Sequence, residues 1–116
     1  MGGRIVGAFV LNEDAQGAYK KGDWKVHLKD GEYLVIHTLA VLPKEYGKGV
    51  ASCMTNYCIG KARSKGYKAL RLDVVPDNVP AKRLYEKNGF SFAGDKDLER
   101  GFENIPLFSL YELNFN

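Results

Sequence analysis

A glycine-rich stretch, YGKGVA at residues 46–51, has the clearest chemical potential in this sequence. It follows an apolar run and precedes residues with helical spacing, so it predicts a tight corner at the start of a helix. Such a corner exposes backbone N–H groups at the positive end of the helix dipole, where a phosphate group binds well. On the glycines alone, a plain strand-to-helix turn without a ligand remains an alternative.

A dinucleotide-binding motif is a second way to interpret the same glycines. Gly47-Lys48-Gly49 could begin a G-x-G-x-x-G motif, and Asp73 follows at about the distance of a ribose-binding acid. Ser52, however, occupies the position of the third glycine, and the residues PKEY separate the corner from its strand. Both departures argue against an oxidoreductase of the Rossmann type.

His37 is a candidate general base, because an imidazole with a pKa near 6.5 suits proton transfer at neutral pH. It lies within a predicted strand, with the side-chain parity of Val35 and Leu39. A hydrogen-bonded core histidine or a residue that shapes the substrate site is an alternative role. Glu32, Glu112 or an ordered water molecule could serve as the base instead.

No metal site is expected. Cys53 and Cys58 are the two cysteines of the chain, five residues apart in a predicted helix, and there are two histidines. They form no Cys/His cluster with the spacing of metal ligands. The two cysteines are also poorly placed to form a disulfide with each other.

A strand, the glycine corner and a helix follow one another within residues 39–66. The helix is predicted from about Gly49 to Lys65, with a basic last turn and Gly66 closing it. Apolar residues at helical spacing predict its buried stripe: Val50, Cys53, Met54, Tyr57 and Cys58. The strand Lys68–Val75 follows, and a strand–helix–strand unit with short links predicts a parallel strand pair.

The rest of the chain predicts further strands and one short helix. A weak strand signal lies at Trp24–Leu28, and the short helix is expected at Ala81–Lys87, with Pro80 near its first turn. The other predicted strands are Arg4–Leu11, Tyr33–Leu42, Phe90–Gly94 and Pro106–Phe115. The near-continuous apolar run of Tyr33–Leu42 is typical of a central strand that is buried on both faces.

Length and composition limit the classes of protein to which the chain can belong. Its 116 residues suit a single domain, and 45% apolar residues suffice for a folded core. No apolar run approaches the roughly 20 residues of a membrane span, and the first residues lack signal-peptide features, so we expect a soluble, cytoplasmic protein. The net charge of +3 is mild and the lysines are scattered among acids, which argues against nucleic acid binding.

The glycine corner resembles the pyrophosphate loop of the GNAT acetyltransferase superfamily, usually written Gln/Arg-x-x-Gly-x-Gly/Ala. Gly49 and Ala51 occupy the two small-residue positions, whereas Tyr46 departs from the usual Gln or Arg. The segments LAVLP and ALRLDV, before and after the helix, are similar to the fourth and fifth strands of the family.

A second set of residues extends the resemblance toward the C-terminus. Asn78 and Ala81, followed by RLYEKNGF, are similar to the Asn-x-x-Ala helix of the family and its Leu-Tyr-x-x-x-Gly-Phe ending. The match is specific over about Val35 to Phe92. Together with the predicted elements, it implies an α/β (α+β) fold: a mixed, mostly antiparallel sheet with one parallel pair, and helices packed against it.

The resemblance implies that acetyl-CoA is the cosubstrate and that a primary amine attacks its thioester directly. The residues implied to contact acetyl-CoA are Leu39, Val41, Tyr46, Gly47, Lys48, Gly49, Val50, Ala51, Ser52, Asn78, Ala81 and Tyr85. Main-chain amides of the loop would hold the pyrophosphate, and Lys48 could add a positive charge. Amides near Leu39 and Val41 would face the pantetheine arm and the acetyl carbonyl.

Two of these residues have an alternative structural role. Tyr85 is implied to be the acid that protonates the leaving thiolate, but it also fits the apolar helix face of Ala81 and Leu84 as a core tyrosine. Asn78 could bond the pantetheine arm, or cap the helix that follows it. The two roles of Asn78 are compatible.

Family members normally begin with a strand and two helices that this sequence does not show before Arg4. Those helices usually form a wall of the acceptor site, so the domain 1–116 is expected to be N-terminally incomplete relative to the family. An uncovered edge strand or apolar face favours self-association, and a homodimer is therefore expected. The alternative function is an acetyl-CoA or CoA-binding sensor or subunit without turnover, and the acceptor amine stays open.

Overall fold

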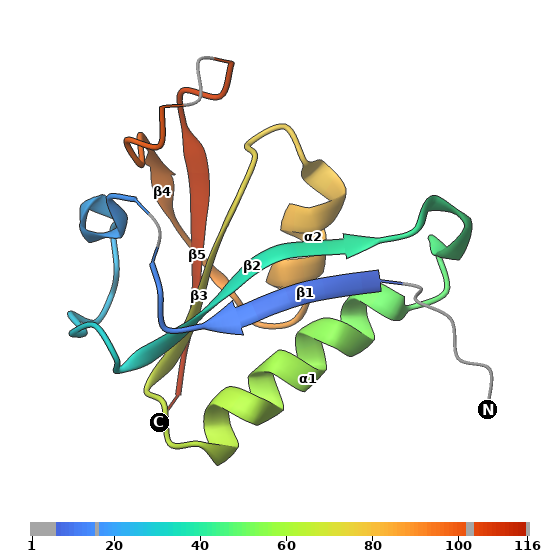
Figure 1. Ribbon diagram of the computed structural model, residues 1–116, viewed down its shortest axis with the longest axis horizontal. Helices are drawn as coiled ribbons and strands as arrows, with labels where there is room; N and C mark the ends of the chain where they lie inside the picture. Colours follow the sequence, from blue (N-terminus) through green and yellow to red (C-terminus); the bar gives the residue numbers. More distant parts are fainter. Residues whose placement is uncertain (1–6, 16, 102–103, 116) are drawn as a thin grey trace.

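The structure is a computed structural model, and it describes residues 7–15, 17–101 and 104–115 (Figure 1). Its elements in chain order are β1 (Gly7–Asn12), the 3-10 helix η1 (Tyr19–Lys21), β2 (Tyr33–Val41), the 3-10 helix η2 (Pro43–Glu45), α1 (Val50–Ser64), β3 (Ala69–Val74), α2 (Val79–Lys87), β4 (Ser91–Lys96) and β5 (Phe108–Asn114). Residues 4–6 of the first predicted strand lie outside the described residues. None of the described helices is long and apolar enough to cross a membrane.

The strands form one sheet in the order β1-β2-β3-β5-β4. β2 and β3 are parallel and are joined by α1, whereas the other three neighbouring pairs are antiparallel. This arrangement confirms the predicted fold class, including the single parallel pair around the glycine corner.

β2 and β3 pair only over their first halves. The ladder runs from Tyr33 opposite Ala69 to Ile36 opposite Leu72, and the two strands then diverge toward their C-terminal ends (Figure 1). Residues 33–36 of β2 are buried, whereas the later residues of the strand are half-buried or exposed where they are described. The prediction of a strand buried on both faces therefore holds for the first half of β2 alone.

A β-bulge in β2 changes which side chains share a face. Ala8 of β1 pairs with Ala40, but Val10 pairs with His37, so β2 has one more residue than β1 between these pairs. Leu39 consequently packs on the same side as Leu34 and Ile36, in one core cluster. The expected common parity of His37 and Leu39 is wrong, because strict alternation assumes an unbulged strand.

Both helices cover one face of the sheet. Residues from α1, α2 and the strands form its core: Leu34, Ile36, Cys58, Ala62, Leu70, Leu72, Val74, Tyr85, Phe90 and Tyr111. Gly66 ends α1 with a φ of +82°, which confirms the predicted glycine closure. Asn88 and Gly89 close α2 in the same region of the chain where the sequence predicts its end.

The buried face of α1 differs from the predicted stripe. Thr55, Cys58 and Ala62 are its buried residues, whereas Cys53 and Tyr57 are exposed. The Thr55 hydroxyl donates to the carbonyl one turn earlier, at 2.8 Å, so its burial leaves no unpaired hydroxyl. Small side chains let the helix approach the sheet closely, a preference that hydrophobicity alone does not reveal.

Residues 13–32 and 97–106, as far as they are described, cover the opposite face of the sheet. There Tyr19, Trp24 and Leu28 pack with Tyr33 and Val35 in a second core cluster. The weak strand predicted at Trp24–Leu28 is wrong. Its backbone bonds to side chains of the sheet instead of to a neighbouring strand: the N–H of Lys25 donates to Glu112, and the carbonyl of Val26 accepts from Arg71.

Candidate functional site

A cleft of about 640 Å³ opens at the end of the sheet where β2 and β3 diverge. Its walls come from the end of β2, the turn into α1 and the first turns of α2. The lining residues are Leu39, Ala40, Val41, Glu45, Tyr46, Gly47, Gly49, Val50, Ala51, Ser52, Asn78, Pro80, Ala81, Leu84 and Tyr85. Every residue that the sequence places at the cosubstrate lines this cleft, except Lys48.

The start of α1 supplies hydrogen-bond donors to this region. Gly49 is the N-cap of the helix and no side chain caps it. The first helical hydrogen bond runs from the N–H of Cys53 to the carbonyl of Gly49, at 3.0 Å. In the described part of the chain, the N–H groups of Gly49, Val50, Ala51 and Ser52 have no hydrogen-bond partner. Four adjacent free donors at the positive end of a helix dipole fit a phosphate group.

Gly47 and Gly49 are required by the backbone of the turn. Their φ angles are +80° and +79°, in the left-handed region that side chains with a Cβ rarely adopt. A Cβ added at either position would meet no atom within 4 Å, so packing does not explain the two glycines. The same open space leaves the backbone of the turn accessible to a ligand.

Lys48 contacts Glu45 and does not line the cleft. Its N–H donates to the carbonyl of Glu45 at 3.3 Å, and its Nζ lies 3.2 Å from the Glu45 carboxylate. Glu45 is only 5% exposed and lines the cleft, whereas Lys48 does not. Tyr46, which replaces the usual Gln or Arg, is 67% exposed at the cleft. The N–H groups and open backbone are therefore the groups of the loop that are available to an anion.

The end of β2 provides an open strand edge inside the cleft. Leu39, Ala40 and Val41 lie beyond the last residue that pairs with β3, while Ala40 and Val41 pair with β1 on the other side. An extended ligand could add to this edge as a short strand does. The bulge turns the Leu39 side chain toward the helices, where it closes part of the cleft wall.

Tyr85 is both a core residue and a cleft residue. Its ring packs against Phe90 and Tyr111, with centroids 5.6 and 6.3 Å away. Its hydroxyl has no hydrogen-bond partner among the described residues. Burial, followed by the neighbouring Cys58 and Asp73, raises the pKa of Tyr85 to about 12. The phenol therefore keeps its proton at neutral pH and can donate it to a group in the cleft.

Asn78 caps α2 and also lines the cleft. Its side-chain oxygen accepts a hydrogen bond from the N–H of Ala81 at 3.2 Å. Within the described residues, the Nδ2 group of Asn78 has no partner, so the cap leaves a donor for a second contact. Asn78 therefore has the predicted capping role and also lies at the cleft.

None of the three side chains considered as a general base lines the cleft. His37 Nε2 lies 2.9 Å from the side-chain oxygen of Asn12 on β1. Glu32 lies directly before the other end of β2 and is hydrogen-bonded to Lys68. This hydrogen bond is the largest cause that lowers the pKa of Glu32. Glu112 is buried on β5 and accepts hydrogen bonds from neighbouring backbone and side-chain groups.

Some cleft residues were not identified from the sequence. Ala40, Pro80 and Leu84 are apolar wall residues next to predicted contacts, so their neighbours were the available signal. Glu45 is a buried carboxylate beside the loop, and no sequence pattern marks an acid at this position as buried. Searching the described residues finds no group of three or more His, Cys, Asp or Glu side chains that could hold a metal ion.

Comparison with known proteins identifies a family model and several relatives. The model of the Acetyltransferase (GNAT) family matches residues 1–90. A mycothiol acetyltransferase from Beutenbergia cavernae is 28% identical over 83 residues, which are 72% of this chain and 28% of the relative. One from Paenarthrobacter aurescens is 33% identical over 86 residues, or 71% of this chain and 27% of the relative. The chain thus spans about a quarter of the length of these curated relatives.

Solved structures share the fold at low sequence identity. An acetyltransferase from Bacillus subtilis in complex with CoA aligns over 100% of this chain and 73% of its own, with a TM-score of 0.75 and 18% identity. A Salmonella typhimurium protein solved with its cofactor acetyl-CoA aligns over 98% of this chain and 60% of its own, with a TM-score of 0.73 and 18% identity. From the family match, together with the sheet and the glycine turn already described, the chain belongs to the GNAT acetyltransferase family.

Proposed function

We propose that the protein transfers the acetyl group of acetyl-CoA to a primary amine, by direct attack within a ternary complex. The observation that carries this proposal is the row of free N–H groups at the start of α1, in a cleft that also contains Tyr85. Solved family neighbours that contain CoA or acetyl-CoA support the choice of cosubstrate.

The chain offers a complementary group for each part of acetyl-CoA. The N–H groups of residues 49–52 hold the pyrophosphate, because they are adjacent, unpaired and at the positive end of a 15-residue helix. The open edge of β2 pairs with the amide groups of the pantetheine arm. Backbone N–H groups near Leu39 and Val41 stabilise the negative charge that develops on the acetyl oxygen, where each good donor contributes about 3 kcal/mol.

Tyr85 supplies the proton for the leaving group. As the amine nitrogen bonds to the carbonyl carbon and the carbon–sulfur bond breaks, the electron pair moves to sulfur. The Tyr85 phenol donates its proton to this thiolate, since the hydroxyl is free and remains protonated at neutral pH. The products are an N-acetyl amide and the free thiol of CoA.

The attacking amine loses its proton to water in the open cleft. Glu45 is the one carboxylate that lines the cleft within the described residues, but it is paired with Lys48 beside the loop. Assigning the proton to water therefore requires no side chain to leave its present contacts. Turnover should rise with pH as more of the amine becomes neutral.

Release of free thiol from acetyl-CoA tests the proposal. The purified protein is mixed with acetyl-CoA and with a small amine, a polyamine, an aminoglycoside or a peptide with a free N-terminus, and thiol formation is followed. Amine-dependent thiol release is expected with at least one of these classes. If none of the amines accelerates thiol release although acetyl-CoA binds, the transferase proposal is wrong.

A CoA-binding sensor or subunit is the second candidate function. The observation that favours it is that His37, Glu32 and Glu112 do not line the cleft, and that the one carboxylate which does, Glu45, is paired with Lys48, as far as the residues are described. Such a protein would bind CoA through the same turn without accelerating acetyl transfer. Binding without amine-dependent thiol release in the same sample is the result that distinguishes it.

We also propose that the protein associates as a homodimer through β1. β1 is an edge strand, and residues 7–12 carry no charged side chain. Val10 on this strand is 49% exposed, and the Phe9 ring packs against the exposed Tyr57 ring of α1, with centroids 5.8 Å apart. An uncharged edge strand beside exposed apolar side chains favours pairing with another strand.

A further inference from the structure

A second pocket, of about 500 Å³, lies on the face of the sheet opposite α1 and α2. Residues from the segment between β1 and β2 form most of its wall, and the sheet forms its floor. The lining residues are Tyr19, Lys20, Trp24, His27, Leu28, Lys29, Asp30, Tyr33 and Arg71. Four of them are basic and one is acidic, and neither core packing nor the proposed acetyl transfer accounts for this excess of positive groups.

Arg71, on β3, is a buried cation with one unpartnered donor. Its side chain is 2% exposed, and its guanidinium lies between the rings of Trp24 and Tyr33, 4.2 and 4.3 Å from their centroids. Nη2 donates to the carbonyl of Val26 at 2.8 Å, whereas Nε is buried with no partner. Glu112, its buried neighbour across the ladder, forms no salt bridge with it among the described residues. Burial lowers the pKa of Arg71, and the charge of Glu112 raises it by a smaller amount. The buried Nε–H group is therefore a donor without a partner in the lining of this pocket.

The exposed basic side chains of the wall are also available to a ligand. Among the described residues, Lys20, His27 and Lys29 form no salt bridge, in contrast with the nearby pair of Lys21 and Glu99 at 3.5 Å. The charge of Lys29 does act on the nearby Glu32. Asp30 is the single carboxylate of the wall. Two exposed lysines and an exposed histidine above a buried guanidinium form a local site for an anion.

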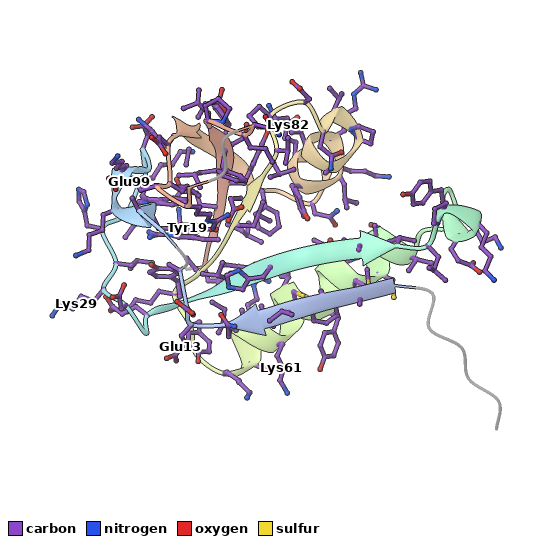
Figure 2. The ribbon with its side chains drawn as sticks, turned by 45° about the horizontal axis from the view of Figure 1, so that its top comes forward. Glu13, Tyr19, Lys29, Lys61, Lys82 and Glu99 are labelled. Carbon is purple, nitrogen blue, oxygen red and sulfur yellow. The ribbon has the colours of Figure 1, made fainter. Side chains whose placement is uncertain are left out.

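The pocket is separate from the cleft of the proposed transferase. It contains Tyr33 at the start of β2, whereas the cleft contains Val41 at its end. Eight residues of extended strand span about 26 Å. Figure 2 shows Lys29 at the opposite end of the molecule from the turn that leads into α1. A ligand in this pocket therefore does not reach the reacting groups.

We propose that this pocket binds a small organic anion. Lys20, His27 and Lys29 contact the carboxylate or phosphate oxygens of the ligand, and Arg71 adds a further basic side chain to the lining. The apolar body of the ligand packs on Leu28 and the aromatic residues of the wall, in a volume typical of small-molecule sites. The proposal does not depend on acetyl transfer.

Trp24 makes the pocket directly observable, because it is the one tryptophan of the chain. Its fluorescence is followed during titration with phenyl phosphate and, separately, with benzoate, each with and without saturating CoA. A saturable change with at least one probe is expected, with the same affinity in both conditions. The two probes distinguish a phosphate from a carboxylate ligand. No saturable change with either probe, or competition with CoA, would overturn the proposal.

A double variant tests whether the lysines of the wall carry the binding. Lys20→Gln with Lys29→Gln should weaken the probe by about tenfold or more, because both side chains are exposed and can be changed without disturbing the core. Lys65→Gln with Lys87→Gln removes the same charge from exposed positions outside the pocket and should leave the affinity unchanged. Equal affinity in all three proteins, or equal weakening in both double variants, would exclude the pocket as the binding site.

Discussion

The Tyr85 hydroxyl lies without a hydrogen-bond partner, within the described residues, in a cleft that also contains the free N–H groups of α1. Tyr85→Phe should lower kcat by about 10²-fold, the lower end of what a general acid contributes, with little change in acetyl-CoA binding. Steady-state thiol release and titration with acetyl-CoA measure the two effects. Tyr111→Phe is the matched control, since its hydroxyl donates to Glu86 at 2.9 Å and it does not line the cleft. Equal kcat values for the two variants would show that Tyr85 is not the acid.

Cys58 should make the free energy of unfolding depend on pH in the alkaline range. Burial raises its pKa to about 11, from an ordinary value near 9. The unfolded thiol therefore ionises first, and the free energy of unfolding should fall by about 2–3 kcal/mol as the pH rises from 9 to 11. Urea titrations at several pH values measure this fall. Cys58→Ala should make the fall in the free energy of unfolding between pH 9 and 11 smaller, whereas Cys53→Ala, at an exposed position, should leave it unchanged. The same slope in both variants would contradict the assignment to Cys58.

At the residue scale, the sequence predicted the glycine turn better than the surroundings of the candidate general bases. Gly47 and Gly49 have backbone angles that other residues rarely adopt, so their identity alone indicates the turn. His37 has no such constraint, because its environment depends on the bulge in β2 and on Asn12 across the ladder. A titratable residue type therefore indicated possible chemistry but not its location.

The start of α2 is an element whose structural and binding roles can be separated. Asn78→Ala removes the cap, and should lower the free energy of unfolding by about 1 kcal/mol and weaken acetyl-CoA binding. Asn78→Ser keeps an acceptor for the N–H of Ala81 but loses the Nδ2 donor. It should therefore retain most of the stability and still bind acetyl-CoA more weakly. Urea titration and calorimetry measure the two quantities, and normal binding by the Ser variant would limit Asn78 to its capping role.

At the scale of elements, periodicity predicted which segments form strands and helices. The same periodicity did not predict the buried side of α1, because Thr55 and Ala62 face the sheet where larger apolar residues were expected. A threonine can be buried there since its hydroxyl bonds to its own helix. The bulge in β2 was also not predicted, because it depends on pairing with β1 and leaves no mark in the alternation of the strand itself.

The proposed dimer is a property of the whole molecule. Val10→Lys places a charge on the exposed edge of β1 and should shift the protein toward the monomer, because an edge lysine opposes strand pairing. Leu107→Lys changes another exposed apolar residue, away from β1, and should leave the assembly unchanged. Light scattering after size exclusion, at several protein concentrations, gives the mass. A monomeric parent protein would contradict the proposal.

For the whole molecule, the strand–helix–strand unit and the family motifs together predicted the sheet and the position of the cleft. The motifs occupy one end of that sheet, so a resemblance over about half of the chain was sufficient to predict where the cleft lies. The second pocket was not predicted, because its cations come from residues 20–29 and from Arg71, which are far apart in the sequence. Only the packing of that segment on the far face brings them together.

Binding of acetyl-CoA to Gly49→Ala and Gly66→Ala, measured by calorimetry beside the parent protein, tests the proposed site most directly. Both glycines have a φ near +80° with open space around them, at the two ends of α1, so each substitution should lower the free energy of unfolding by about 1–2 kcal/mol. We expect saturable binding by the parent and by Gly66→Ala, and binding at least tenfold weaker by Gly49→Ala, whose methyl group occupies the approach to the free N–H groups. No binding by the parent, or equal binding by the two variants, would contradict a cosubstrate site at the glycine turn.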